Sequence, residues 1–420
     1  MSGSGNNGAQ NSGAQNNGTQ SFGALAGGRS YLAIPGPSVV PDAVLNAMHR
    51  ASPNIYAGAL IDMTDTLIPD LKRVARTQAH VAIYIANGHG AWEAAFANTL
   101  APGDRVLALV TGRFGQGWAE MAHSMGAEVQ MLDFGRTSPI DPARVEEALR
   151  ADKGHKIKAV LATHVDTSTS ALSNMAAIRA AIYAAGHPAL LMADCIASLA
   201  CDRFEMDEWG VDIVVTGSQK GLMMPPGLGF VFFSDKAAEV RRGLSRVSPY
   251  WDWTLRAQPD HFYQYFFGTA PTHHLYGLRA ALDMIHGEGI EAVWARHDRL
   301  ARAIWAACEV WAEGGALRIN MSDRAHRSRA VTALSLPAPG ASDLRAWLEQ
   351  NAGITLGVGL GMAEPDDPAW HGYFRIGHMG HVNAQMVLGV LGSIEAGMAA
   401  LNIPRGQGAI GAAAQVIAEG

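Results

Sequence analysis

Lys220 and Asp194 are the two side chains of this 420-residue sequence whose types and surroundings point most clearly to chemistry. Lys220 is one of only six lysines. It follows the apolar run V-D-I-V-V-T at a small polar turn, whereas the other five lie in charged or helix-surface contexts. Because burial disfavours an ammonium ion, an enclosed lysine has a lowered pKa and a nucleophilic amine that attacks carbonyl compounds. Asp194 closes a second apolar run, A-L-L-M-A-D. Such a pair is the minimum for holding pyridoxal phosphate: the amine condenses with its aldehyde, and the carboxylate keeps its pyridine nitrogen protonated.

Glycine-containing and polar segments follow other expected strands, and each has a structural explanation when taken alone. Gly88 could form a plain turn, His89 could be a core histidine, Phe114 could be ordinary packing, and Asp194 could cap a helix. In an open α/β sheet, however, ligands bind beyond the carboxyl ends of the strands, so these segments should meet at one edge. The sequence therefore predicts one binding pocket assembled from several strand ends.

Each segment has a task that its chemistry suits. Backbone N–H groups at the helix start after Asn87 favour a phosphate, helped by the helix dipole. Phe114 offers a flat apolar face to a pyridine ring, and Ile196 packs against the opposite face. The remaining hydrogen-bonding side chains suit the ring oxygen or the phosphate: Ser168 or Thr169 for the oxygen, and Gln219 for the phosphate.

Apolar strands alternate with amphipathic helices from about residue 31 to 235, which predicts an α/β fold with a mostly parallel sheet covered on both faces. The strand G-F-V-F-F-S follows Lys220 too closely for a crossover helix and should be antiparallel. Later residues mix long helices with short strands, as in an α+β domain. The expected division is a disordered low-complexity tail (1–28), a large domain (29–275, with an N-terminal arm at 29–45), a smaller α+β domain (276–402) and a C-terminal tail (403–420).

Composition excludes several functional classes. The net charge is −6 and charged residues make up 17%, so no basic surface is expected to bind nucleic acid or an anionic membrane. We find neither a membrane-spanning run nor a signal-peptide pattern, so we expect a cytoplasmic protein. The three cysteines lack metal-ligand spacing and should be buried free thiols, and we expect no metal site.

Over roughly residues 31 to 400 the chain resembles the class V, fold-type I aminotransferases, closest to the alanine–glyoxylate and serine–glyoxylate (serine–pyruvate) enzymes. The most specific segments are D-C-I-A-S-L at 194–199 and V-D-I-V-V-T-G-S-Q-K-G-L-M-M-P-P-G at 211–227. Supporting motifs occur in the family's order: P-G-P-S at 35–38, G-H-G-A-W-E-A-A at 88–95, L-A-P-G-D at 100–104, G-R-F-G-Q at 112–116, T-H-V-D-T-S-T-S at 163–170, G-T-A-P-T-H-H-L-Y-G-L at 268–278 and F-R-I-G-H-M-G at 374–380.

This resemblance implies a role for individual residues. Lys220 would form the Schiff base and shuttle the proton, and Asp194 would face the pyridinium. Arg375 would bind the substrate α-carboxylate through its planar fork, beside Pro35 and Gly36. The cofactor contacts would include Gly88, His89 and Gln219 at the phosphate, Ser168 at the ring oxygen, and Thr269, which would reach the phosphate of a partner subunit. That last role implies a homodimer with shared active sites.

The sequence departs from the family pattern at four positions. Asn87 stands where a small serine is usual, Phe114 replaces the stacking tryptophan, and Ser170 stands where glycine is common. Phe266 replaces a tyrosine, and whether Tyr263 or Tyr265 compensates is open from the sequence. These changes leave cofactor binding intact but leave the substrate undefined.

The predicted reaction is a ping-pong transfer of an amino group from a small amino acid, such as alanine or serine, to glyoxylate or pyruvate. Arg113 is the one weak candidate for a side-chain carboxylate partner, so small neutral substrates are favoured. Alternatives are a pyridoxamine–pyruvate-type aminotransferase, a lyase of the same fold, or a non-catalytic scaffold. A cysteine desulfurase among those lyases would need an exposed cysteine.

Overall fold

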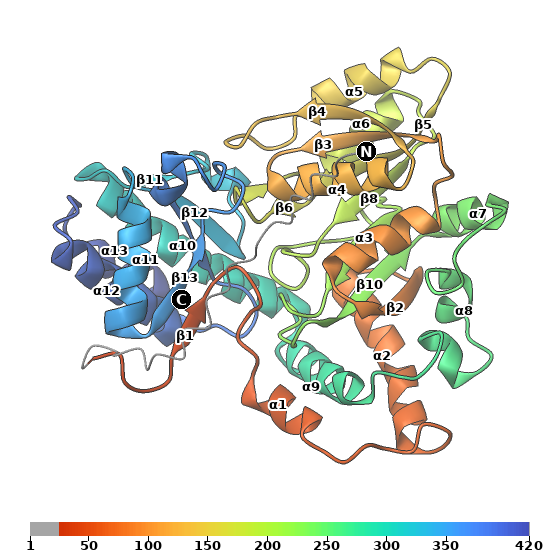
Figure 1. The fold of residues 1–420 in the computed structure, drawn as a ribbon, viewed down its shortest axis with the longest axis horizontal. Coiled ribbons are helices and arrows are strands. Elements are labelled where there is room, and N and C mark those ends of the chain that lie inside the picture. The colour runs from red at the N-terminus through yellow and green to blue at the C-terminus, as the bar shows by residue number, and fades with distance from the viewer. Residues whose placement is uncertain (1–24, 420) are drawn as a thin grey trace, which may run out of the picture.

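The structure, a computed structural model, describes residues 25–419 and comprises a large and a small domain (Figure 1). Most of the tail expected at 1–28 lies outside the described residues. The first strand, β1, begins at Tyr31, where the sequence predicts that ordered structure starts. Among residues 25–419, no helix combines the length and the apolar composition needed to cross a membrane.

A seven-stranded sheet forms the centre of the large domain, with strand order β2-β10-β9-β8-β5-β3-β4. All its strands run parallel except β10, which pairs antiparallel with both β2 and β9. The expectation of a mostly parallel sheet with an antiparallel strand after Lys220 is therefore confirmed. The strands are β2 (His80–Ala86), β3 (Arg105–Val110), β4 (Glu128–Asp133), β5 (Ile157–Thr163), β8 (Leu190–Asp194), β9 (Ile213–Gly217) and β10 (Gly227–Phe233). A separate hairpin pairs β6 (Val165–Asp166) with β7 (Ala171–Leu172).

Helices cover both faces of this sheet because successive strand residues point to opposite sides. In β5, Val160 and Ala162 enter one apolar core, whereas Ala159 and Leu161 enter another. The first core is closed by α1 (Asp42–Met48), α2 (Ala59–Ala75), α5 (Pro142–Ala151), α6 (Met175–Ala184) and α9 (Thr272–Glu288). The second is closed by α3 (Gly88–Ala97), α4 (Arg113–Ser124), α7 (Asp235–Gly243) and α8 (Trp253–Ala257).

The small domain is an α+β unit with its own apolar core. Its sheet has the order β1-β13-β14-β12-β11, in which β1 runs parallel to β13 and the remaining pairs are antiparallel. Its elements are β1 (Tyr31–Ala33), α10 (Ile290–Glu313), β11 (Arg318–Ile319), β12 (Val331–Ser335), α11 (Gly340–Ala352), β13 (Ile354–Val358), β14 (Tyr373–Gly377), α12 (Ala384–Ala400) and α13 (Ala409–Ala418). Short 3-10 helices lie at Phe262–Tyr265, Arg324–His326 and Pro368–Gly372.

Three details differ from the expected domain division. The N-terminal arm contributes β1 to the small domain, and Figure 1 shows this strand beside β13. The boundary at 275/276 falls inside α9, whose Leu275, Leu278 and Leu282 pack in the large-domain core. The chain at 403–420, expected as a tail, includes helix α13, which buries Ala409 and Ala413 against the small domain. All three features depend on contacts between distant segments, which sequence periodicity does not report.

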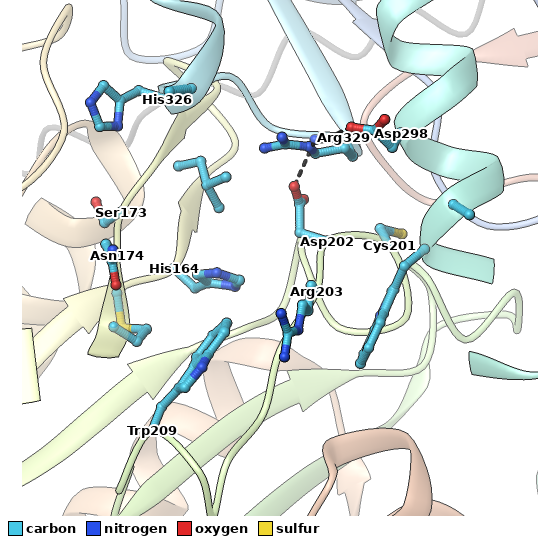
Figure 2. A pocket seen from close by; sticks show the side chains of 15 residues that line it. His164, Ser173, Asn174, Cys201, Asp202, Arg203, Trp209, Asp298, His326 and Arg329 are labelled. Atoms are coloured by element: carbon cyan, nitrogen blue, oxygen red, sulfur yellow. Dashed lines mark hydrogen bonds and ion pairs between the residues drawn. The ribbon is translucent and has the colours of Figure 1, made fainter. Parts of the chain in front are cut away.

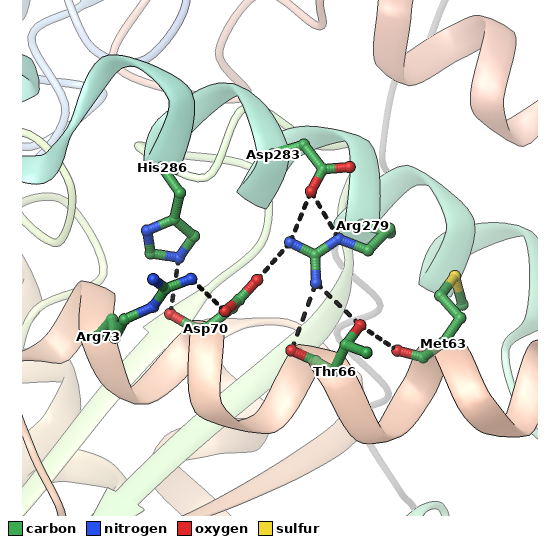
Figure 3. A network of polar contacts seen from close by, with 7 residues as sticks. All are labelled: Met63, Thr66, Asp70, Arg73, Arg279, Asp283 and His286. Atoms are coloured by element: carbon green, nitrogen blue, oxygen red, sulfur yellow. Dashed lines mark hydrogen bonds and ion pairs between the residues drawn. The ribbon is translucent and has the colours of Figure 1, made fainter.

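A partly buried polar network joins α2 to α9 in the large domain (Figure 3). Arg279 of α9 donates to the side chain and backbone oxygens of Thr66, at 3.1 and 3.3 Å, and forms an ion pair with Asp70. Although burial alone would raise the pKa of Asp70, hydrogen bonds from Arg279 and Arg73 hold that pKa below its usual range. The two helices are thus joined by charge as well as by apolar packing.

Candidate active site

Lys220 lies in the turn that follows β9 and is held by the N-terminal arm. Its Nζ donates to the carbonyl oxygen of Pro35, while Ser38 Oγ donates to the Lys220 carbonyl at 2.7 Å. Gly36 has a φ of +105°, and a Cβ there would lie 2.3 Å from Lys220 Nζ, so only glycine fits. Burial, reinforced by the nearby charge of Arg375, lowers the pKa of Lys220 to about 8. A substantial fraction of the amine is therefore neutral near physiological pH.

Asp194 ends β8 and is buried next to the same space. Its Oδ2 accepts a hydrogen bond from Trp92 Nε1 at 3.1 Å, and its Oδ1 accepts one from the backbone N–H of Ile196 at 2.8 Å. Burial raises the pKa of Asp194 to about 7, and the neighbouring Asp166 adds to this effect. A cationic partner would reverse that shift, because an opposite charge favours the ionised carboxylate.

One enclosed cavity of about 140 Å³ contains both groups. It lies beyond the carboxyl ends of the strands, as expected for an open α/β sheet. Phe114 and Ile196, the two expected ring-packing residues, both line it. The complete lining is Gly88, His89, Trp92, Phe114, Val165, Thr167, Asp194, Ile196, Ala197, Gln219 and Lys220.

The start of α3 and Gln219 form one end of this cavity, and their donors suit an anion. Asn87 caps α3 by accepting hydrogen bonds from His89 N at 3.0 Å and Gly90 N at 3.3 Å. A Cβ on Gly88 would lie 2.4 Å from Ile196 Cδ1, so a larger residue at this position would displace the Ile196 side chain that lines the cavity. The Oε1 atom of Gln219 is buried without a hydrogen-bond partner. Because Asn87 already accepts from two of the first N–H groups of α3, a bound phosphate would rely on the helix dipole and on a Gln219 amide turned to donate, and with these groups the residues fit pyridoxal phosphate.

The segment after β5 places its hydroxyl groups differently from the sequence expectation. Ser168 does not line the cavity; its Oγ donates to Asp166 Oδ1 at 2.5 Å and accepts from Arg113 N at 3.0 Å. Thr169 is also buried away from the cavity, and Thr167 lines it instead. Ser170 has a φ of +61°, a left-handed conformation that glycine adopts with less strain than serine.

Arg375 extends from β14 of the small domain towards the large domain. It is buried, and its guanidinium donates to two carbonyl oxygens, Val358 O at 2.7 Å and Thr167 O at 2.9 Å. No carboxylate pairs with it within residues 25–419. Burial lowers the pKa of Arg375 to about 10, which still leaves it charged at neutral pH. A buried cation without an anionic partner is suited to bind a carboxylate.

Thr269 lies away from the cavity of its own chain, exposed after a short 3-10 helix. Nearby, Phe266 is buried in the apolar core, whereas Tyr263 is 56% exposed. Tyr265 donates its hydroxyl to Asp65 at 3.0 Å, so that hydroxyl is already engaged. Of the two tyrosines considered for the phosphate, only Tyr263 has a hydroxyl without a hydrogen-bond partner among residues 25–419.

A second, larger cleft of about 610 Å³ separates the two domains and contains neither Lys220 nor Asp194 (Figure 2). Its charged groups largely pair with one another. Arg329 donates through its backbone N–H to Asp202 at 2.8 Å and through Nε to Asp298 at 3.2 Å. These contacts indicate an interface between domains rather than a reaction site.

Sequence reasoning missed two residues of the cavity with clear tasks, Trp92 and Thr167. Trp92 lies in the helical motif G-H-G-A-W-E-A-A, one turn after the expected phosphate contacts, so its helical position could have suggested an inward direction. Thr167 adjoins Ser168, and nothing in the sequence indicates which hydroxyl faces inward. All three cysteines are buried, as expected, so no described cysteine has the exposure that a desulfurase requires.

The seven-stranded sheet carries Lys220 and Asp194 at the carboxyl ends of its strands. Together with the small α+β domain, this arrangement defines a fold-type I transferase. The chain belongs to the class V aminotransferase family, whose model matches residues 30–384. It is 37% identical to the serine–glyoxylate aminotransferase of Methylorubrum extorquens, over 88% of this chain and 90% of the relative. It is also 37% identical to the L-aspartate–glyoxylate aminotransferase of Paracoccus denitrificans, over 91% and 94% of the two chains. The pyridoxamine–pyruvate aminotransferase structure from Mesorhizobium loti superposes with a TM-score of 0.82 at 25% identity, covering 93% of this chain and 97% of the other.

Proposed function

We propose that this aminotransferase uses pyridoxal phosphate to move an amino group from a small neutral amino acid, such as serine or alanine, to glyoxylate or pyruvate. The observation that carries the proposal is the single cavity shared by the Lys220 amine and the Asp194 carboxylate. Arg375, buried without an anionic partner, adds a cation suited to a substrate carboxylate.

We match each part of the cofactor to a protein group of the cavity. The α3 N-terminus and Gln219 would hold its phosphate, Phe114 and Ile196 would pack against its ring, and Asp194 would face its pyridine nitrogen. When bound, the cofactor supplies the electron-withdrawing ring that makes the α-hydrogen of an amino acid acidic.

The chain's own residues supply binding, orientation and proton transfer. Arg375 would fix the α-carboxylate through its planar guanidinium, and the arm at Pro35–Ser38 would cover the amine of Lys220 from solvent. With a pKa of about 8, the Nζ of Lys220 suits both removal and return of the α-proton near neutral pH. Asp194, once ionised, would stabilise a positive charge on the pyridine nitrogen of the cofactor.

Small neutral donors are favoured because the one nearby candidate for a second carboxylate is already paired. Arg113 is 47% exposed and contacts Glu120 at 3.3 Å. Serine is the donor named for one relative, and aspartate is named for another. The likeness to a pyridoxamine–pyruvate aminotransferase keeps pyridoxamine as the second candidate donor.

We further propose that the protein acts as a homodimer with shared active sites. Thr269 is exposed and lies outside its own cavity, where a partner's phosphate would reach it. Beside it, the exposed aromatic residues Tyr56 and Tyr263 line one surface pocket that a second subunit would cover.

The first experiment measures cofactor binding and half-reactions together. We expect purified wild-type protein to bind pyridoxal phosphate with a visible absorption band. We expect Lys220→Ala to lose covalent retention of the cofactor after borohydride treatment and to lose at least about three orders of magnitude in kcat. A donor panel of serine, alanine, aspartate and pyridoxamine against glyoxylate and pyruvate then identifies the substrates.

Two outcomes would contradict the proposal. The first is a wild-type protein that cannot be reconstituted with pyridoxal phosphate. The second is turnover that needs no oxo-acid acceptor, which would indicate a lyase instead. Lys236→Ala is a matched control, because Lys236 is a partly exposed lysine outside the cavity.

A further inference from the structure

The carboxylate of Asp166 is completely buried beside the cofactor cavity and accepts four hydrogen bonds. Its Oδ2 accepts from the backbone N–H groups of Phe114 and Gly115, each at 3.0 Å. Its Oδ1 accepts from the backbone N–H of Ser168 at 3.0 Å and from Ser168 Oγ at 2.5 Å. Every contact uses Asp166 as an acceptor, which an ionised carboxylate provides at both oxygens and an amide does not.

These bonds join two segments that line the cavity. One is the start of α4, which carries Phe114, and the other is the loop after β6, which carries Thr167 and Ser168. The two approach so closely that a Cβ on Gly112 would lie 2.5 Å from Ser168 Oγ and 2.6 Å from Asp166 Cγ. Glycine at 112 is therefore required for Asp166 to reach α4.

The Asp166 carboxylate also determines whether the Ser168 hydroxyl can donate a hydrogen bond to a ligand. Because Ser168 donates its hydroxyl hydrogen to Asp166 and accepts from Arg113 N, its single hydrogen-bond donor is already engaged. Thr167 lines the cavity and has its carbonyl bonded to Arg375 Nη1 at 2.9 Å. Phe114 and Thr167 thus line the cavity, and Asp166 lies behind them without lining it.

We propose that Asp166 is a positioning residue of the cofactor site: its acceptor-only carboxylate joins the start of α4 to the loop after β6 and so fixes Phe114 against the ring. This inference rests on the proposed function, because it assumes that the cavity holds pyridoxal phosphate.

The charge of Asp166 also affects both ionisable groups around it. It raises the pKa of Arg375 against the opposing effect of burial, which keeps the guanidinium charged for a substrate carboxylate. It also adds to the raised pKa of Asp194. Neutralising Asp166 should therefore change the cofactor site and the carboxylate site together.

The test compares Asp166→Asn, which keeps the shape, with Asp166→Glu, which keeps the charge and both acceptors. The control is Asp202→Asn. Asp202 is a buried carboxylate of the domain cleft that likewise accepts a backbone N–H, from Arg329 at 2.8 Å, and a serine hydroxyl, from Ser328 at 3.0 Å. Three readouts apply to each variant: the affinity for pyridoxal phosphate, the circular dichroism of the cofactor band, and the KM for the amino acid separately from kcat.

We expect Asp166→Asn to weaken cofactor affinity about tenfold, to reduce the cofactor dichroism and to raise KM, since the amide nitrogen leaves at least one backbone N–H without an acceptor. Asp166→Glu should lie closer to wild type than Asp166→Asn on all three readouts. Asp202→Asn should lower the melting temperature but leave the dichroism unchanged. If Asp166→Asn does not fold, Gly112→Ala, which crowds the same carboxylate, should reproduce the loss of dichroism.

The inference is overturned if Asp166→Asn matches wild type, if it lies closer to wild type than Asp166→Glu, or if Asp202→Asn causes the same changes. A wild-type protein without a cofactor band would instead refute the proposed function, so the two failures are distinguishable.

Discussion

At the scale of single residues, burial sets the chemistry of this site. Lys220 and Asp194 both have pKa values moved towards neutrality because each is withdrawn from water. Arg375 opposes the charged form of Lys220, whereas Asp194 favours it. The pKa of the Lys220 amine is thus set in part by two opposite charges, Arg375 on β14 of the small domain and Asp194 on β8 of the large domain.

The pH dependence of cofactor capture should report this arrangement. We expect the rate at which cofactor-free protein captures pyridoxal phosphate to rise with pH, with a midpoint near the Lys220 pKa of about 8, and to level off at higher pH, where the amine is neutral. Arg375→Gln removes a charge that lowers the pKa of Lys220, so the midpoint should move to higher pH. Stopped-flow absorbance at several pH values measures both curves, and a midpoint that is unmoved or lower in the variant would contradict the assigned interaction.

At the scale of elements, the α2–α9 contact shows how a helix pair is fixed by one partly buried arginine. Arg279 is 18% exposed and bonds to Thr66, Asp70 and Asp283, whereas Arg73 bonds to the same Asp70 but is 62% exposed. Screening by water makes the exposed pair weak, while loss of the enclosed arginine leaves a partly buried carboxylate without a partner.

We therefore expect Arg279→Ala to lower the free energy of unfolding by about 1–3 kcal/mol and Arg73→Ala by less than about 1 kcal/mol, as measured by urea denaturation. The pKa of Asp70 is held low in the folded state, so its contribution is present above its unfolded pKa and is lost as the pH falls through the folded value. The difference between wild type and Arg279→Ala should accordingly shrink below about pH 4. Equal losses of unfolding free energy in the two variants would contradict the expectation that burial strengthens the Arg279–Asp70 ion pair.

The elements were predictable to the extent that their signals are local. The alternation of apolar strands and amphipathic helices indicated the parallel sheet, and the short connection after Lys220 indicated the reversed direction of β10. The pairing of β1 with β13 was not predictable, because the two strands lie more than three hundred residues apart in the sequence. Likewise, Thr167 and Ser168 are adjacent hydroxyl residues, and only the three-dimensional contacts of the loop, such as the bond from Ser168 to Asp166, show which one lines the cavity.

At the scale of the whole molecule, the proposed dimer makes a prediction about mixing two defective chains. Lys220→Ala lacks the amine, and Thr269→Glu would repel the phosphate of the partner's site. In a mixed dimer, one site receives an intact Lys220 from one chain and an intact Thr269 from the other. An equal mixture should therefore recover about a quarter of wild-type activity, since half the dimers are mixed and each has one complete site.

The measurement is activity after joint refolding of the two variants, compared with each variant refolded alone. Sites built within single chains would give no recovery on mixing. Sedimentation of the mixture confirms that dimers have formed, which separates failed assembly from failed complementation.

Strand β1 belongs to the small domain, and Pro35 and Ser38, which follow it directly, contact Lys220 of the large domain. This short segment connects the two domains covalently and by hydrogen bonds, so a rotation of the small domain would displace the backbone at Pro35 and Ser38. Shortening the chain beyond Tyr31 would therefore do more than remove an edge strand: it would release the lysine from its backbone partners and uncouple its position from the movement of the domain that carries Arg375.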